Sequence, residues 1–385
     1  MQKKIIALAI AGLASSAAFA QSNVTIYGRA DYGYISRGGD SGAMPNSIDS
    51  RNEFASGIGA GSRIGFKGSE DLGNGLKAIF EIEYGTAIDS QATSGTGASA
   101  YWWNRHSYVG LTSDKYGTLV GGKLDGVRYG IFNKYDAFAG GYMGNFTQMT
   151  SQVDRADNAI AYISPKFGGG FDLTLAYSTA IGTNNGLANT GNGQEGANAT
   201  LGNGATAVNG NDGDAWLKTI RLAYGNGPIS VDLDWEQVSY KGGKVTGPAL
   251  VINDVTVYTI AGSYDFGMVK VAALYDNLMV DGRTGFRKLG DVDSWMLSAT
   301  IPYGNFAFKG TYGETDDNDV KNKSATKWGL GAQYNLSKRT NMYIDYGSIN
   351  NDKASAIKIS PAANAYGAAS AYGTHGWDIG MAHNF

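Results

Sequence analysis

The 385-residue sequence contains no cysteine and only 6 prolines. Without cysteine the chain can form neither a disulfide nor a thiolate metal site, so its stability must come from the fold itself. The formal net charge is only −3, and charged residues make up 17% of the chain. Proteins that bind nucleic acid usually carry a clear surplus of basic residues, so this charge balance argues against that class.

A long apolar run is also missing. After residue 20 no stretch of about 18 apolar residues is present, so the sequence predicts no membrane-spanning helix. The apolar run at residues 5–13 is too short to span a bilayer. It follows two lysines and precedes small residues at Ala18 and Ala20. This arrangement predicts a cleaved secretory signal peptide over residues 1–20 and a mature chain over residues 21–385.

Glycine and tyrosine, in contrast, are abundant, with 57 and 24 residues. Apolar and polar residues alternate along much of the chain, which is typical of β-strands that have one apolar face. In residues 229–236, for example, the residues on one face are apolar, and the other face carries Ser230, Asp232, Asp234 and Glu236. The same period occurs in residues 171–178, 295–301 and 328–334.

The connections between the alternating segments differ in length. Tight turns are predicted near residues 71–75, 114–117, 165–170, 225–228, 266–267, 302–305 and 336–339. Long polar stretches lie between them, near residues 36–60, 87–101, 124–154, 180–214, 241–253, 280–290, 315–326 and 350–373. A soluble β-sandwich would also alternate, but aromatic residues at the strand ends and short turns opposite long loops favour a membrane barrel. We therefore predict an all-β fold, a transmembrane antiparallel barrel of about 16 strands, which is wide enough to leave a water-filled channel.

The stretch at residues 182–214 is rich in asparagine, glycine and alanine and is interpreted as a surface loop. Residues 209–214 have some likeness to a calcium-binding loop, but they lack an EF-hand spacing or a repeated nonapeptide. We therefore predict no metal site and no other cofactor.

Several segments together carry a family resemblance. They are residues 22–28, 61–78, 105–111, 155–162, 335–340 and 380–385. Through them the sequence resembles the general porins of Gram-negative bacteria, of the neisserial and β-proteobacterial type, over nearly all of the mature chain. The resemblance implies a homotrimer in the outer membrane, in contact with lipid and lipopolysaccharide. It also implies that the terminal Phe385 is an assembly signal read by the barrel-assembly machinery.

The resemblance further implies that the third long loop, from about Asp125 to Asp154, folds into the barrel and faces basic residues on the wall. The wall residues expected from the motifs are Arg63, Arg105, Arg155 and Lys123. The charged residues expected in the loop are Asp125, Arg128, Lys134, Asp136 and Asp154.

Alternation tests part of this expectation independently of the family. Ile64 and Phe66 are apolar, so Arg63 and Lys67 should face the lumen. The apolar residues after Arg155 place that arginine inward in the same way. Arg105 is ambiguous, because it has the same parity as the apolar Val109 and Leu111.

These residues predict passive diffusion of small hydrophilic solutes and ions, with a weak preference for anions, because the loop offers no strong acidic cluster. The inward acids at residues 232–236 argue in the opposite direction. Alternatively, the wall arginines are neutralised by Glu81, Glu83 or Asp157 and leave no selectivity.

The sequence bears on three other functions. A substrate-specific channel for sugars or anions would use an aromatic track, and the loop offers Tyr129, Phe132, Tyr135, Phe138, Tyr142 and Phe146, although these could equally pack the loop against the wall. An adhesive surface barrel is possible with long loops. An enzyme is not expected, because none of the three histidines lies in a motif with a nucleophile, and the sequence has no G-x-S-x-G, P-loop or H-E-x-x-H pattern.

Overall fold

The computed structural model describes residues 23–39, 50–89, 102–150, 153–180, 189–190, 199–200, 215–240, 250–284, 287–355, 357, 359 and 373–385. The first strands are β1 (Asn23–Gly38), β2 (Arg51–Ser56), β3 (Arg63–Gly73), β4 (Leu76–Thr86), β5 (Trp102–Ser113), β6 (Gly117–Asp125), β7 (Arg155–Ile163) and β8 (Phe171–Ala180). The two-residue strands β9 (Asn189–Thr190) and β10 (Ala199–Thr200) pair only with each other. The remaining strands are β11 (Ala215–Asn226), β12 (Ile229–Tyr240), β13 (Leu250–Asp265), β14 (Lys270–Thr284), β15 (Arg287–Tyr303), β16 (Phe306–Asp317), β17 (Ser324–Asn335), β18 (Thr340–Asn351) and β19 (His375–Asn384). Two short helices, α2 (Val127–Tyr135) and the 3₁₀ helix η1 (Phe146–Met149), lie between β6 and β7.

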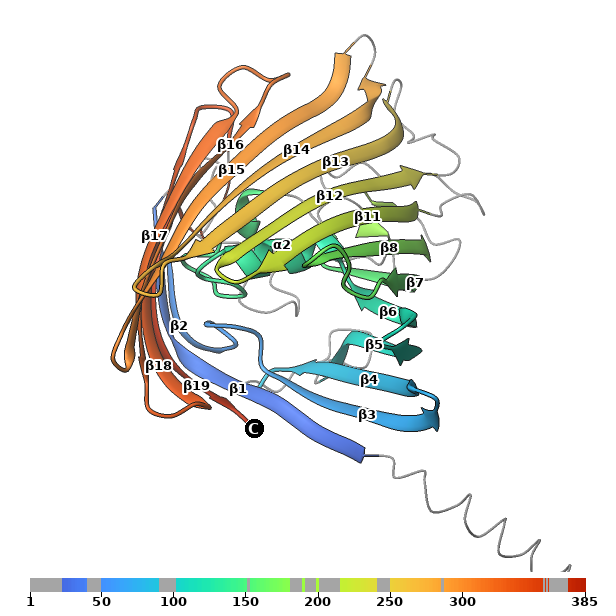
Figure 1. Ribbon diagram of the computed structural model, residues 1–385. Coiled ribbons are helices and arrows are strands. Elements are labelled where there is room, and N and C mark those ends of the chain that lie inside the picture. The colour runs from blue at the N-terminus through green and yellow to red at the C-terminus, as the bar shows by residue number, and fades with distance from the viewer. Residues whose placement is uncertain are drawn as a thin grey trace, which may run out of the picture.

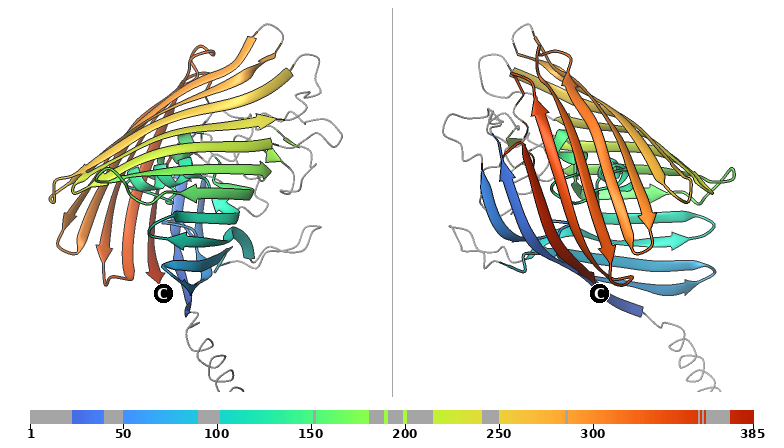
Figure 2. Two further views of the ribbon diagram at one scale, coloured as in Figure 1. Left: turned by 45° about the vertical axis from the view of Figure 1, so that its right-hand side comes forward. Right: turned by 90° about the vertical axis from the view of Figure 1, so that its left-hand side faces the viewer.

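The strands close into one antiparallel barrel. Each wall strand pairs with the next strand of the wall, β8 pairs with β11, and β1 pairs with β19 to close the sheet. Sixteen strands make the wall when β2 and β3 are counted as the two halves of one strand. Figures 1 and 2 show these strands tilted around a common lumen. The predicted 16-stranded antiparallel barrel is confirmed, and closure leaves the barrel sheet without an edge and without any disulfide.

The second wall strand is interrupted. Its upper half, β2, pairs with the second half of β1, whereas β3 pairs with the first half. Between them, residues 57–62 leave the ladder and contact the lumen face. The backbone N–H groups of Gly59 and Ala60 donate to the carboxylate of Asp31, at 3.1 and 3.2 Å, and Gly59 also donates to Tyr343 Oη. The break therefore projects backbone into the barrel.

All seven predicted tight turns connect consecutive strands at one end of the barrel, as the antiparallel order requires. One predicted long loop is wrong: β14 extends to Thr284 and β15 begins at Arg287, so most of residues 280–290 continue the ladder. The predicted signal peptide lies outside the described residues, as does nearly all of the predicted loop at 182–214. Among the described residues, no helix is long and apolar enough to cross a membrane.

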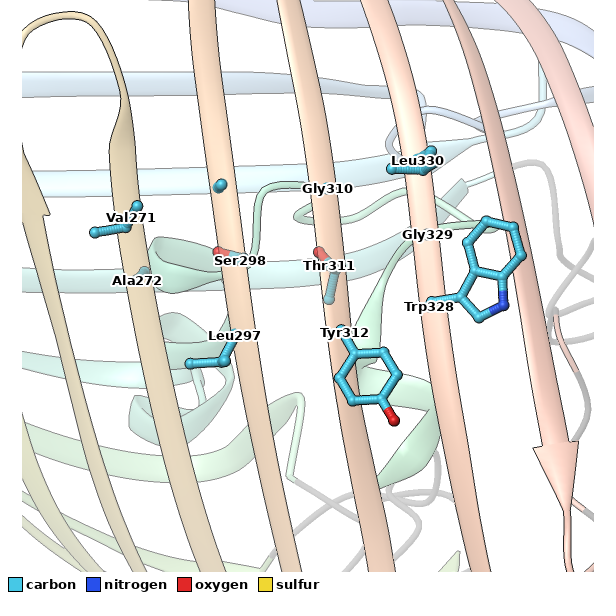
Figure 3. Close-up of a pocket in the computed structure, with 11 residues that line it drawn as sticks. Val271, Ala272, Leu297, Ser298, Gly310, Thr311, Tyr312, Trp328, Gly329 and Leu330 are labelled. Atoms are coloured by element: carbon cyan, nitrogen blue, oxygen red, sulfur yellow. The ribbon is translucent and has the colours of Figure 1, made fainter.

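Burial alternates along the strands with the apolar set outside. On β15 to β18, large apolar side chains such as Leu297, Tyr312 and Leu330 are exposed, whereas their polar neighbours are buried. This is the reverse of a soluble sheet and fits an apolar band that faces lipid. The outer face of β14 to β17 also has a shallow hollow of 510 Å³, where Gly310 of β16 has no side chain beside Leu330 of β17 (Figure 3).

Candidate site in the barrel lumen

The described residues of the connection from β6 to β7, 126–150 and 153, extend into the lumen. Figure 1 shows α2 inside the ring of strands, and α2 contacts β12, β13 and β14 on the far wall. The two ends of the connection are held together by a hydrogen bond from Gly126 N to Asp154 O, at 2.9 Å. We call these described residues, 126–150 and 153, the lumen loop; they lie within the third long loop of the sequence.

A buried ion pair fixes the start of α2. Arg128 donates from Nε and Nη2 to the two carboxylate oxygens of Asp276 on β14, at 2.7 and 2.5 Å. Their side chains are 0% and 2% exposed. Thr259 Oγ1 donates to the same carboxylate at 2.6 Å. Because the pair is bidentate and its carboxylate has a further donor, it fixes both the position and the orientation of the helix.

Asp232 on β12 holds the end of α2. Its carboxylate accepts from Lys134 Nζ at 2.7 Å and from Tyr135 Oη at 2.6 Å. On its other side it accepts from Arg221 Nε of β11 at 2.5 Å. The predicted inward orientation of Asp232 is thus confirmed, but this acid serves the lumen loop and is fully buried.

The second half of the lumen loop is organised by Asp136 and Lys327. The Asp136 carboxylate accepts from the backbone N–H groups of Phe138 and Phe146, at 2.9 and 2.6 Å. Lys327, which is fully buried on β17, donates to the carbonyl of Asn145 and to Gln148 Oε1. Asp136 therefore shapes the loop internally instead of facing the lumen.

Glycines on the wall make room for the lumen loop. A Cβ atom built on Gly329 of β17 would lie 2.7 Å from the Cα of Gly144. On β18, a Cβ at Gly347 would meet the carbonyl oxygen of Met143. Side chains at these inward positions would push the loop off the wall, so the close approach depends on glycine.

The aromatic residues of the lumen loop mostly pack against the wall. Phe132, Tyr135, Phe138 and Phe146 are all buried, and only Tyr129 and Tyr142 of the six candidates are partly exposed. Packing against the wall is the alternative to an aromatic track for sugars that the sequence left open. No observation on these residues therefore favours a track.

The opposite wall, formed by β1 and β3 to β7, carries a group of partly exposed charges. Arg29 on β1 lies directly across the ladder from Arg63 on β3. Two like charges in this position repel each other unless anions lie between them. Asp31 accepts from Arg29 Nη2 at 2.7 Å, and Glu83 Oε2 lies 3.7 Å from Arg63 Nε.

A register shift explains how Arg105 joins this group. Ile82 pairs with Ser107 and Tyr84 with Asn104, so Glu83 faces two residues of β5, Arg105 and His106. The extra residue lets both side chains point inward even though Val109 and Leu111 face outward. Arg105 Nε donates to Glu83 Oε1 at 2.5 Å. The ambiguous parity is therefore resolved by a bulge that alternation cannot reveal.

Arg155 completes the group at the start of β7. Its Nε lies 3.0 Å from Asp125 Oδ1, and its guanidinium lies 5.6 Å from the centre of the Tyr129 ring. Asp154 lies near the charges of Arg155 and Asp125. Burial raises the pKa of the Asp154 carboxyl, whereas the positive charge of Arg155 lowers it.

Exposure differs between the cations and the anions of this wall. The Arg63 side chain is 29% exposed, whereas its partner Glu83 is 5% exposed. Arg29 is 15% exposed over a fully buried Asp31. The guanidinium groups of these pairs therefore cover their carboxylates and form the surface that a solute meets. Asp125, which is 40% exposed, and Glu81, which is 20% exposed, are exceptions.

The structure places the other two basic candidates differently. Lys67 is exposed at the edge of this group, directly across the ladder from Glu81, and its Nζ lies 5.0 Å from the centre of the Tyr27 ring. Lys123 pairs in register with Ser107, on the face that carries Val109, and its Nζ binds Asp157 at 2.7 Å. The register thus aligns Lys123 with outward residues, and we leave it out of the group.

Phe385 lies at the end of the closing strand. Its backbone exchanges two hydrogen bonds with Gly28 of β1, both 3.1 Å long. Nothing in the geometry tests its predicted role as an assembly signal.

Sequence reasoning missed Arg29, Asp31 and His106 as members of the site. Parity on β1 contained the signal, since Ile26 and Tyr32 face outward and the odd-numbered residues between them face inward. We call Arg29, Arg63, Arg105 and Arg155, with their carboxylates, the arginine wall.

A family model described as Gram-negative porin matches residues 7–354. The sequence is 29% identical to an outer membrane porin protein of Bordetella pertussis, over 90% of this chain and 94% of that protein. It is 26% identical to the major outer membrane protein P.IB of Neisseria gonorrhoeae, over 95% of this chain and 98% of that protein. Among solved structures, the anion-selective porin from Comamonas acidovorans is similar with a TM-score of 0.72 and 27% identity, covering 95% of this chain and all of that one.

The chain therefore belongs to the Gram-negative porin family. It is an integral protein of the outer membrane, and both its family and its fold are those of a channel rather than an enzyme. The resemblance to the neisserial and β-proteobacterial porins is confirmed.

Proposed function

We propose that this porin is a general diffusion channel for small hydrophilic solutes and ions, with a weak preference for anions. Its narrowest part lies between the lumen loop and the arginine wall. The observation that carries the proposal is the exposure of Arg63 and Arg29 over Glu83 and Asp31. A pore selects by the charge at its narrowest point, where low-dielectric walls strengthen the field.

The anion preference is expected to be weak because each arginine is partly neutralised by a carboxylate. Arg105 and Arg63 share Glu83, and Arg155 has Asp125 as its partner. The positive field in the lumen is therefore weak and comes from the greater exposure of the guanidinium groups over their carboxylates. The similarity to a porin whose name describes it as anion-selective supports the same sign.

We further propose that the chain assembles as a homotrimer in contact with lipid and lipopolysaccharide, and that Phe385 directs barrel assembly. Membership of the Gram-negative porin family supports these proposals, and the exposure of Phe385 is consistent with a residue that another protein reads. We also propose that a signal peptide at residues 1–20 directs export of the chain.

The test is the reversal potential of the purified channel in a planar bilayer under a KCl gradient. We expect a small potential of the sign that favours chloride. In Arg63→Gln, the chloride-to-potassium permeability ratio should fall about twofold, as expected for one charge at roughly 10 Å in water. Arg105→Gln should act in the same direction.

Lys115→Gln is the matched control, because it removes one positive charge from an exposed tight turn outside the lumen. It should leave the permeability ratio unchanged. A potential that favours potassium in the unmodified channel would contradict the proposed selectivity. Absence of ion current from the folded barrel would contradict the channel itself.

A further inference from the structure

His106 on β5 lies between carboxylates from two neighbouring elements. Its Nδ1 is 3.1 Å from Asp125 Oδ2, and its Nε2 is 3.3 Å from Glu81 Oε1. Glu83 Oε1 lies 3.9 Å from Nδ1. A neutral imidazole has one N–H donor and can serve only one of these carboxylates, whereas the protonated ring can donate to both. The surroundings of His106 thus match an imidazolium cation.

The other charges around His106 cancel. Arg29 and Asp31 pair with each other. The remaining cations are Arg63, Arg105, Arg155 and Lys67, and the remaining carboxylates are Glu81, Glu83, Asp125 and Asp154. Four cations therefore face four carboxylates. The proton on His106 decides whether this part of the lumen has a positive surplus.

Three phenols complete the surroundings. Tyr27 of β1 and Tyr108 of β5 donate to Glu81, at 2.5 and 2.6 Å, and Tyr129 of α2 lies against the Arg155 guanidinium. The two donors stabilise Glu81 as an anion, which gives Nε2 of the histidine a charged acceptor. Phenols generally keep their protons over the range in which imidazole titrates.

We propose that His106 is a specificity-determining residue whose protonation sets the anion preference of the channel. At low pH the imidazolium adds one positive charge at the narrowest part of the lumen. At high pH that charge is lost and the anion preference weakens. The inference rests on the proposed position of the constriction, but it concerns a change with pH and not the sign of the selectivity.

The experiment measures the reversal potential of the channel at fixed KCl gradient from about pH 5 to 8.5, the range in which histidine changes charge. In the unmodified channel we expect the chloride-to-potassium permeability ratio to fall about twofold across this range. His106→Gln should give a nearly constant ratio, close to the high-pH value of the unmodified channel. His106→Lys should stay near the low-pH value, because lysine remains charged.

Two control variants keep the result specific. His383→Gln removes the histidine whose Nδ1 lies 2.8 Å from Thr340 at the turn end of the barrel, and it should keep the full pH response. Asp154→Asn removes the nearby loop carboxyl and should also keep it. A pH response that persists in His106→Gln would overturn the inference, as would a pH-independent ratio in the unmodified channel.

The two proposals fail in different ways. If the channel favours potassium at every pH but its ratio still depends on His106, the proposed anion preference fails and this inference stands. If the channel favours chloride equally in the unmodified protein and in His106→Gln at all pH values, the inference fails and the proposed function stands.

Discussion

Two sides of the lumen use the same residue types in opposite ways. Under the lumen loop, Arg128 and Asp276 form a pair that is almost completely buried. Across the lumen, Arg63 is 29% exposed beside a buried Glu83. The first pair fixes a backbone segment, and the second presents a charge to water. Burial and not residue type therefore determines whether an arginine in this barrel supports the structure or faces solutes.

The same comparison explains the acids of β12. The sequence shows Asp232, Asp234 and Glu236 facing inward, which taken alone suggests a cation-attracting wall. All three are buried, and Asp232 is used by Lys134 and Tyr135 of the lumen loop. Asp232 therefore anchors the lumen loop, and its charge is compensated by Lys134 and Arg221.

The largest effect is expected from breaking the buried pair. Arg128→Met leaves the Asp276 carboxylate buried and without its guanidinium, which should lower the free energy of unfolding by about 3–5 kcal/mol. The midpoint of urea unfolding in detergent measures this loss. Single-channel conductance should rise at the same time and become noisier, because the start of α2 is no longer fixed.

A double variant distinguishes the lost anchor from an uncompensated charge. Arg128→Met combined with Asp276→Leu removes both charges, so most of the stability should return while the conductance remains altered. A single variant as stable as the unmodified protein would show that the pair does not hold the loop.

An intermediate effect, on selectivity instead of stability, is expected from Glu83→Gln. The change removes the carboxylate shared by Arg63 and Arg105, and an amide oxygen can still accept from Arg105. The chloride-to-potassium permeability ratio should rise about twofold, and the free energy of unfolding should change by about 1 kcal/mol. Reversal potential and urea unfolding measure the two quantities.

Glu53→Gln is the matched control for this variant, because Glu53 pairs with Arg37 and Arg51 on β1 and β2 and not with the arginine wall. It should leave the permeability ratio nearly unchanged. If Glu83→Gln lowers the stability but leaves the permeability ratio unchanged, then the arginine wall has a structural role, like the pair of Arg128 and Asp276, and does not set selectivity.

Much of the fold could be predicted from the sequence because alternation and turn spacing are local signals. The seven tight turns and the inward orientation of Arg63 follow from a period of two, which holds wherever the ladder is regular. The predicted long loop at residues 280–290 was wrong, because polar residues there still pair as strands.

The site was less predictable because it depends on irregular backbone and on distant partners. The bulge opposite Glu83 brings Arg105 and His106 inward together, and no local pattern marks it. The pairing of Arg128 with Asp276 joins residues 148 positions apart. Inward glycines such as Gly329 and Gly347 were visible in the alternation, but their meaning depends on which segment lies above them.

The smallest effect is expected from Lys123→Gln, and it tests where the arginine wall ends. Lys123 is aligned with outward residues of β5 and has its own partner, Asp157, in a pair that is partly exposed. Removal of such a pair costs roughly 0–1 kcal/mol, and a charge on the far side of the wall should not alter the permeability ratio. Reversal potential under the same KCl gradient as for Arg63→Gln provides the direct comparison. If the permeability ratio falls as far as in Arg63→Gln, then the charge of Lys123 acts on the lumen despite its register, and Lys123 belongs with the arginine wall.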